Sequence, residues 1–206
     1  MKRLAEARVG STVELPPPPV SGQMTVEQAI AQRRSWRDFD PEPLTMQQVS
    51  QLLWAAQGIT HDGQLRAAPS AGACYPLETY LVCRYGVFRF LPREHAVLKT
   101  AEGDPRPQLA RAALGQRFVS DAPATIAFAA LYERTVSRYG ERGFRYVYMD
   151  AGAAAENVHL QAEALDLGSV SVGAFDDDAV AAALGLPSGE KAIYLIPVGR
   201  RAEGRR

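Results

Sequence analysis

Residues 32–39 read QRRSWRDF, so three arginines and a serine occupy five successive positions in a chain whose formal net charge is zero. Guanidinium groups and a hydroxyl at this spacing can surround a phosphate with charge-assisted hydrogen bonds. The alternative is a solvated turn in which Asp38 and Asp40 neutralise the arginines. Taken alone, the cluster favours the charged turn, so the rest of the chain has to decide between the two.

A helix is expected directly before the arginines. Thr25 and Gln28 form a capping-box pattern, and Val26, Ala29 and Ile30 then lie on one helical face. This helix runs into the arginine cluster, so the cluster begins where a helix gives way to a loop.

A second helix is expected after the chain breaks at DPEP. Thr45 and Gln48 form another capping box, and Leu44 and Val49 are spaced as a hydrophobic staple. Gly58 ends this helix. The arginine segment is therefore predicted to connect two capped helices.

Runs rich in β-branched, aromatic and apolar residues predict strands at 77–83, 87–90, 123–131 and 191–198. An alanine-rich helix is expected at 150–167, closed by Gly168, with SVSVG beyond it as a further strand. Asp176 to Asp178 provide an N-cap for a short final helix. Helices and strands mix without a regular βαβ order, so the predicted fold class is α+β.

The proline run LPPPPV fixes backbone dihedrals and lacks N–H donors, which favours an extended arm. We expect it to lie as a strap across this protein's own surface or a partner subunit, rather than to be a ligand for a proline-reading domain. Residues 1–22 are thus predicted as an arm and residues 23–206 as a single domain, a size that can bury a proper core.

Composition excludes several classes of protein. A net charge of zero argues against nucleic acid as a partner, because phosphate-backbone binding leaves a broad basic footprint. Cys74 and Cys83 are the only cysteines and are expected to be reduced thiols in a cytoplasmic protein. The longest apolar stretch is shorter than the roughly 20 residues of a membrane span, and no secretory leader is expected.

Several motifs are missing. The sequence contains neither a P-loop nor a GxGxxG fingerprint, and GSVSVG is not the GxSxG of a hydrolase nucleophile. His159 and Glu163 lie one helical turn apart, but two residues do not make a metal site, so no metal is expected and a structural or surface role is favoured.

RRSWRDF resembles the RRSxRxF signature of the FMN-dependent nitroreductase superfamily. Further blocks follow in the order seen in its SagB-type branch, named for dehydrogenases that oxidise azolines to azoles in modified peptides: PLTMQQVSQLLWAAQG, APSAGACYP, YGERGFRYVYMDAG, GSVSVGAFDDDAV and YLIPVGR. The resemblance covers nearly the whole chain. It implies a nitroreductase-like fold, with a central, mainly antiparallel sheet flanked by helices and FMN at the interface of a homodimer.

The resemblance assigns the arginine segment to FMN. Arg33, Arg34 and Ser35 match contacts to the phosphate and ribityl chain, and Arg37 matches the cation that faces flavin N1 and O2. A fixed guanidinium there would stabilise the negative charge of the reduced flavin.

Other matched residues come from distant parts of the chain. Pro69, Ser70 and Ala71 match a loop that reaches the flavin of the partner subunit, with small residues that let the backbone approach the ring. An ordinary turn is the alternative for that loop. Gln116 resembles an amide contact to the flavin or ribityl chain.

Towards the C-terminus, Gly173 and Ala174 match the position where a backbone N–H meets flavin N5, the atom that accepts the hydride. Arg200 resembles a second phosphate ligand, and Arg205 and Arg206 are either further ligands or part of the tail.

Two departures from the SagB-type pattern bear on the reaction. The resemblance implies that azoline-oxidising relatives use a Lys-Tyr pair near the YGERG block, where the nearest match in this chain is Arg138 and Tyr139. An arginine stays protonated where a lysine could exchange a proton. Arg37 and Tyr139 remain the candidate assistants in catalysis. The segment between ETYLVCR and GVFRF is also shorter than in relatives, so no extra substrate-covering loop is expected there.

The leading interpretation is an FMN-dependent oxidoreductase that passes a hydride through flavin N5 between NAD(P)H or an organic donor and a small-molecule acceptor. An azoline dehydrogenase of a modified-peptide pathway is one alternative. A catalytically idle flavin-binding subunit of a larger assembly is the other.

Overall fold

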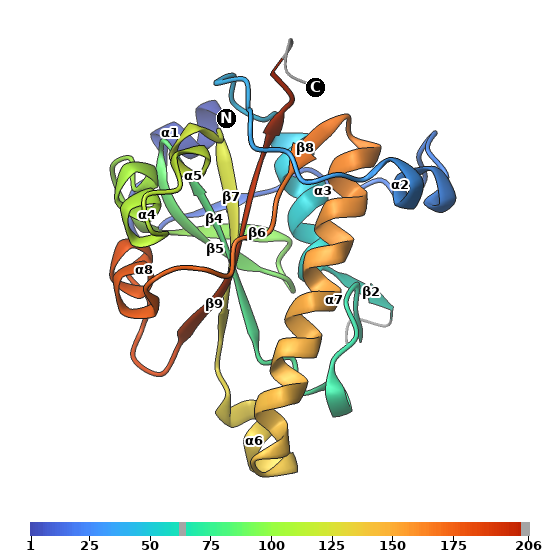
Figure 1. Ribbon diagram of the computed structural model, residues 1–206, viewed down its shortest axis with the longest axis vertical. Coiled ribbons are helices and arrows are strands. Elements are labelled where there is room, and N and C mark those ends of the chain that lie inside the picture. The colour runs from blue at the N-terminus through green and yellow to red at the C-terminus, as the bar shows by residue number, and fades with distance from the viewer. Residues whose placement is uncertain (62–64, 203–206) are drawn as a thin grey trace.

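A seven-stranded antiparallel sheet forms the frame of the protein (Figure 1), in a computed structural model that describes residues 1–61 and 65–202. Each neighbouring pair of strands is antiparallel. Across the sheet the strands are β1 (Thr12–Glu14), β6 (Ala96–Ala101), β5 (Gly86–Leu91), β4 (Leu77–Cys83), β7 (Ala124–Ala130), β9 (Lys191–Arg200) and β8 (Leu167–Ser169). The α+β class with a mainly antiparallel central sheet is confirmed.

The centre of the sheet follows from the apolar run of β7. All seven residues of this strand are buried, and it pairs with β4 on one side and β9 on the other. A strand that is buried at every position needs cover on both faces. A separate two-stranded sheet joins β2 (Ile59–His61) to β3 (Leu65–Arg66).

Helices cover both faces of the sheet (Figure 1). The longer ones, α3 (Met46–Gln57) and α7 (Arg142–Ala164), form one core with Leu77 and Leu81 of β4. On the opposite face, Tyr80 and Val82 of the same strand contribute to a core with helices α4 (Arg106–Ala112), α5 (Arg117–Asp121) and α8 (Asp177–Leu184). The side-chain alternation of β4 therefore divides the interior into two layers.

Both predicted capping boxes are present. Thr25 caps α2 (Val26–Gln32) and Thr45 caps α3, each with its glutamine partner in the reciprocal bond. The expected apolar face of α2 is only partly used within one chain. Ala29 is buried, whereas Val26 and Ile30 are 65% and 59% exposed.

The helix expected at 150–167 is longer, and its end was assigned wrongly. It begins at Arg142, after the short helix α6 (Glu133–Tyr139), because Gly143 lets the two helices meet: a Cβ there would lie 2.8 Å from the Cα of Val136. Gly168 does not close it. Asp166 adopts the left-handed backbone after the helix, with φ of 56°, and Gly168 already belongs to β8.

The proline run lies across α3 of its own chain. Pro16 accepts a hydrogen bond from Ser50 through its carbonyl, and Pro19 accepts one from Gln51. Before the run, the first 22 residues contain helix α1 (Lys2–Glu6) and strand β1 at the edge of the main sheet. The arm is therefore not a plain extended segment, since a helix and an edge strand precede its proline-rich part, which starts at residue 15.

Candidate active site

The arginine segment runs along the edge strand β8. Helix α2 ends at Arg33, and Ser35 then forms a parallel backbone bridge with Ser169. The N–H of Trp36 donates to the Ser169 carbonyl at 3.0 Å. Side chains alternate in such an extended segment, so Ser35 and Arg37 are exposed while Trp36 is partly buried.

Trp36 packs the arginine segment against strand β8. A Cβ on Gly168 would lie 2.7 Å from the Trp36 Cβ, so only glycine fits beneath the indole. The guanidinium of Arg201 lies 5.1 Å from the Trp36 ring centroid and also forms a 2.6 Å ion pair with Glu163, which is 4% exposed. Glu163 thus has a structural role at this site.

The arginines are poorly neutralised by carboxylates. Arg33 lies 3.6 Å from Glu156, while Arg34 donates to the carbonyls of Ala31 and of Arg33 at the end of α2. Arg37 lies over the Phe118 ring at 5.7 Å. Within the described part of the chain, neither Arg34 nor Arg37 forms an ion pair. Among the described residues, Asp38 and Asp40 form no ion pair with these arginines, and Arg34 and Arg37 are exposed to solvent.

His159 has the structural role that the sequence favoured, but its position beside the arginine segment was not predicted. It is buried, and its Nδ1 and Nε2 atoms each lie 2.7 Å from a hydroxyl oxygen, that of Ser169 and that of Ser171. Burial, assisted by the charge of Arg33, lowers the pKa of His159 to about 4. The ring is therefore neutral at pH 7 and fixes the strand segment next to Ser35.

Gly173 and Ala174 follow this segment and are exposed. Val172 pairs with Leu195 of β9 through two backbone hydrogen bonds, which fixes the chain just before them. The Gln116 amide nitrogen donates to the Ala174 carbonyl at 3.0 Å. Gln116 thus holds the loop at Ala174, and Phe118, two residues further along the chain, lies under Arg37.

An aromatic cavity of about 640 Å³ opens beside Gly173. The Tyr132 ring lies 5.2 Å from that of Phe144 and 6.0 Å from that of Tyr148. Burial and a hydrogen bond with Tyr148 raise the pKa of Tyr132. The mouth also carries charged residues, Asp177, Asp178 and Lys191. The cavity suits a planar apolar ligand that has a polar edge.

A carboxylate of helix α7 holds the loop of Pro69, Ser70 and Ala71. The Ser70 hydroxyl donates to Asp150 at 2.6 Å, and the Ala71 N–H donates to the same carboxylate at 3.3 Å. Asp150 is buried, and burial raises its pKa although both hydrogen bonds act in the opposite direction. Pro69 remains exposed. The loop is therefore rigidly built but open to solvent.

Arg138 and Tyr139 lie against the same loop. Arg138 donates to the Gly72 carbonyl at 2.9 Å, and a Cβ on Gly72 would collide with the Tyr139 hydroxyl. Gly72 has φ of 57°, the left-handed region that glycine adopts without strain. The structure thus brings the Arg-Tyr pair to the loop, not to the arginine segment.

The predicted residues therefore form two groups along α7. The arginine segment contacts α7 at Glu156 and is held by His159, whereas the loop contacts it at Asp150. At 1.5 Å per residue these contacts are about 9–14 Å apart along the helix axis. Within one chain the loop does not contact the arginines in any interaction among the residues described.

Arg200 lies between the arginine segment and the C-terminus. Its carbonyl accepts from the Asp40 N–H, and its guanidinium forms a 2.7 Å ion pair with Glu42. This ion pair competes with the phosphate contact that the resemblance implied. Arg205 and Arg206 lie outside the described residues.

Comparisons with known proteins identify the family of this chain. A model of the nitroreductase family matches residues 30–200. The chain belongs to the nitroreductase family. A Methanocaldococcus jannaschii protein with a provisional nitroreductase name is 40% identical over 201 residues, which is 95% of this chain and 100% of that protein. Family membership assigns this protein to the flavin oxidoreductases.

Solved structures agree with this nitroreductase fold. A Ralstonia eutropha protein, also provisionally named a nitroreductase, has a TM-score of 0.85 at 31% identity, over 94% of this chain and 90% of that one. The NADPH:FMN oxidoreductase of Vibrio harveyi, solved with NAD⁺, has a TM-score of 0.64 at 22% identity, over 87% of this chain and 72% of that one. At that identity the likeness concerns the fold alone.

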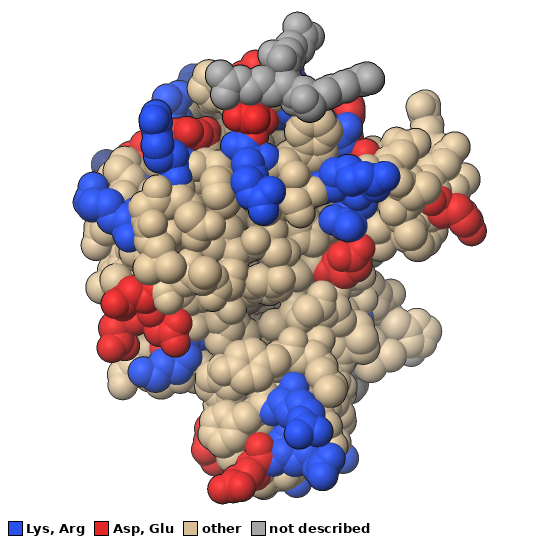
Figure 2. Space-filling view, viewed as in Figure 1, with Lys and Arg blue, Asp and Glu red and all other residues tan. Residues whose placement is uncertain are grey.

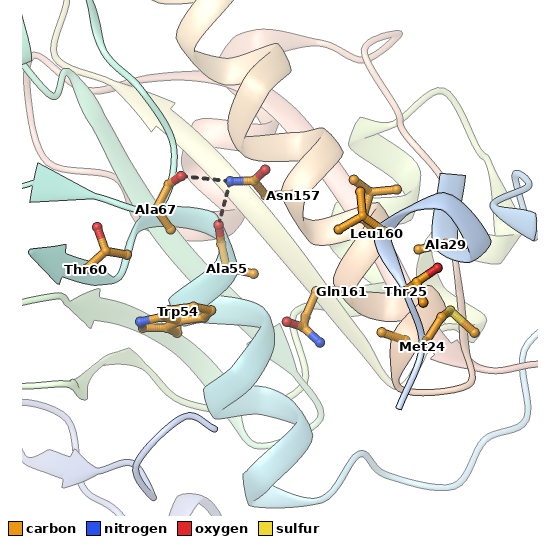
Figure 3. A pocket seen from close by; sticks show the side chains of 12 residues that line it. Met24, Thr25, Ala29, Trp54, Ala55, Thr60, Ala67, Asn157, Leu160 and Gln161 are labelled. Atoms are coloured by element: carbon orange, nitrogen blue, oxygen red, sulfur yellow. Dashed lines mark hydrogen bonds between the residues drawn. The ribbon is translucent and has the colours of Figure 1, made fainter. Parts of the chain in front are cut away.

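The surface of this nitroreductase-family chain carries a second, apolar cavity. It has a volume of about 350 Å³ and lies between α2, α3 and α7, where Trp54 and Leu160 face it (Figure 3). Asn157 closes one end through hydrogen bonds to the carbonyls of Ala55 and Ala67. The exposed Val26 belongs to its rim, so the poorly covered face of α2 continues into this cavity.

Charge is unevenly distributed on the face that carries α7. Figure 2 shows a mostly uncharged, hollowed middle, with lysine and arginine gathered towards both ends. Within residues 1–61 and 65–202, no helix combines the length and apolar character that a membrane crossing needs. The same residues contain no group of three or more histidines, cysteines or acids able to hold a metal ion.

Proposed function

We propose that the protein is an FMN-dependent oxidoreductase that transfers a hydride between NAD(P)H or an organic donor and a small-molecule acceptor. The observation that carries this proposal is that Arg34 and Arg37 have no carboxylate partner among the described residues. Arg37 lies over Phe118 of α5, and Gln116 at the start of that helix holds the exposed backbone at Ala174. Unpaired guanidiniums suit a terminal phosphate, and small residues let a ring approach the backbone. The residues present therefore fit FMN.

Each residue group has a separate task in this proposal. Arg33, Arg34 and Ser35 would hold the phosphate and ribityl chain, and Arg37 would face the pyrimidine edge of the ring. FMN, when bound, supplies the hydride chemistry through N5. His159 is a positioning residue, because it fixes Ser169 and thereby the bridge to Ser35.

The proposal includes a homodimer whose flavin sites are shared. Apolar residues remain exposed on α2 and on the first half of α7, namely Val26, Ile30, Phe144, Tyr148 and Met149. The loop at Ser70 is rigid and open, yet lies apart from the arginines of its own chain. A second copy that covers these apolar residues would let the loop complete the partner's site.

The proposal includes two classes of hydride donor, NAD(P)H and an organic substrate. Tyr139 remains a candidate assistant, because it lies at the loop that would meet the partner's flavin. The arginine beside it does not favour the azoline dehydrogenase alternative, since a guanidinium stays protonated. A cytoplasmic location and a single domain at residues 23–206 complete the proposal.

Anaerobic stopped-flow reduction of the purified protein with NADH, NADPH and organic donors tests this function at the flavin absorbance band. We expect a yellow protein that releases FMN on denaturation and is reduced by at least one donor. A colourless protein that takes up no added FMN would refute the cofactor. Bound FMN that no donor reduces would favour the idle subunit, and light scattering that shows a stable FMN-loaded monomer would refute the shared site.

A further inference from the structure

A third cavity carries more positive charge than its own carboxylates neutralise. It has a volume of about 380 Å³ and lies beyond the Ser70 loop, beside β3, β5 and the start of α6. Its described lining includes four arginines and two glutamates: Arg66, Arg89, Arg93, Arg134, Glu78 and Glu94. None of these residues belongs to the candidate flavin site.

Two of the arginines have structural partners. The side chain of Glu78 is 12% exposed, and its two oxygens accept from Arg89 at 2.8 Å and from Arg134 at 2.7 Å. Behind them, the buried Glu190 lies 3.6 Å from Arg89 and accepts from the Tyr80 hydroxyl at 2.7 Å. These carboxylates connect β4, β5 and α6 and are already paired with Arg89 and Arg134.

Arg66 has no carboxylate partner among the described residues. One of its nitrogens donates to the Gln57 amide oxygen at 2.9 Å, and the guanidinium lies 4.7 Å from the Tyr75 ring centroid. Burial lowers the pKa of Arg66, and the charges of Arg134 and Arg93 act in the same direction, against Glu78. Among the charged groups, Glu78 acts most strongly, so desolvation is the main cost to the Arg66 cation, and a bound anion would offset it.

Arg93 extends this imbalance to the cavity mouth. It is exposed and forms no ion pair with any described residue. Arg66 and Arg93 therefore present unused guanidinium donors to one cavity, whose wall also offers the Tyr75 ring. Planar guanidinium groups match phosphate oxygens in bidentate geometry and stack on flat rings.

We propose that this cavity binds the phosphate group of a small ligand, with Arg66 and Arg93 as the binding residues. The volume exceeds what a single phosphate fills, so a phosphate monoester with an organic group beside Tyr75 fits as well as the free ion. The site is separate from the arginines at residues 33–37 and stands whether or not those bind FMN.

Isothermal titration calorimetry of the purified protein, as isolated, with inorganic phosphate and with AMP tests the proposal. We expect saturable binding that weakens as salt rises, because charge is screened. Tighter binding of AMP identifies a monoester as the source of the phosphate, whereas equal binding identifies the free ion. Absence of saturable binding for both ligands at millimolar concentration would overturn the proposal.

Matched variants locate the binding. Arg66→Gln and Arg93→Gln should each weaken it about tenfold, the effect of losing a charge-assisted hydrogen bond. Arg111→Gln removes the same charge from an exposed position on α4 and should bind like the unchanged protein. Arg34→Gln distinguishes this cavity from the arginine segment at residues 33–37. If Arg34→Gln loses phosphate or AMP binding and Arg93→Gln keeps it, the assignment to this cavity is overturned. Arg93 is exposed, so its variant is expected to fold even if Arg66→Gln does not.

Discussion

The Nδ1 atom of His159 lies 2.7 Å from the hydroxyl oxygen of Ser169, the residue whose backbone forms the bridge to Ser35. One buried imidazole thus connects the long helix to the segment that carries the arginines. Its lowered pKa makes this connection depend on pH.

The first prediction is that acid weakens the protein through His159. Its folded pKa of about 4 lies below the ordinary value of 6.5, so the unfolded chain binds more protons between these values and stability falls as pH falls. Between pH 7 and pH 5 the loss attributable to this residue is about 2 kcal/mol. Urea unfolding at both pH values measures it. His159→Gln should show a smaller difference between the two, and an equal difference would show that the imidazole does not titrate as described.

The second prediction compares two glycines. Gly168→Ala places a Cβ 2.7 Å from that of Trp36, and the crowding should cost about 1–3 kcal/mol of unfolding free energy. Gly152→Ala is the matched control, because nothing lies within 4 Å of its added Cβ in the middle of α7. That variant should gain about 0.5–1 kcal/mol, since alanine favours the helix. Thermal and urea unfolding of both proteins provide the measurement, and a stable Gly168→Ala would contradict the packing described.

The third prediction concerns cofactor affinity. Arg33→Ala combined with Arg34→Ala should weaken FMN binding at least about tenfold, because two charge-assisted hydrogen bonds of about 1.5–3 kcal/mol each are lost. Fluorescence titration of the apoprotein with FMN measures the change. Arg111→Ala removes an exposed arginine elsewhere and should leave the affinity unchanged. Unaltered FMN affinity in the double variant would return the segment to the interpretation of a charged turn.

The fourth prediction separates binding from electronic tuning. Arg37→Gln should keep much of the FMN affinity but lower the flavin midpoint potential, because the guanidinium interacts mainly with the reduced form. An interaction that is stronger on the reaction path than in the ground state changes the rate, whereas uniform binding does not. We expect reduction by the donor to slow about tenfold to hundredfold. Spectroelectrochemistry measures the midpoint potential and stopped flow measures the reduction rate. Wild-type values of both would show that Arg37 does not face the pyrimidine edge of the flavin.

Local signals in the sequence predicted local structure well. The capping boxes at Thr25 and Thr45 are short, self-contained hydrogen-bond patterns, and the apolar run of β7 can only be a covered strand or helix. The start of α7 was missed because its first two turns are polar and aromatic on their exposed side. Gly168 was wrongly predicted to end the helix for a different reason. Glycine also lets a neighbouring group come close to the backbone, and at position 168 that neighbour is Trp36.

The site was predictable where side chains act through type and spacing, and not where distant residues meet. His159 and Ser169 lie on different elements, and neither residue alone indicates the hydrogen bond between them. The one available signal was the helical-turn spacing of His159 and Glu163, which indicated a shared face but not its partners. The cavity at Arg66 required the fold, because its arginines come from two strands, a turn and a helix.

The continuous helix α7 limits how this chain can vary in length. Asp150 holds the loop and His159 holds the strand next to the arginines, with nothing but helix between them. Each residue turns the helix by about 100°. A single inserted or deleted residue between these two positions would rotate His159 away from Ser169 while the loop stayed in place. Relatives that keep both contacts are therefore constrained to preserve this spacing, whatever their loops do elsewhere.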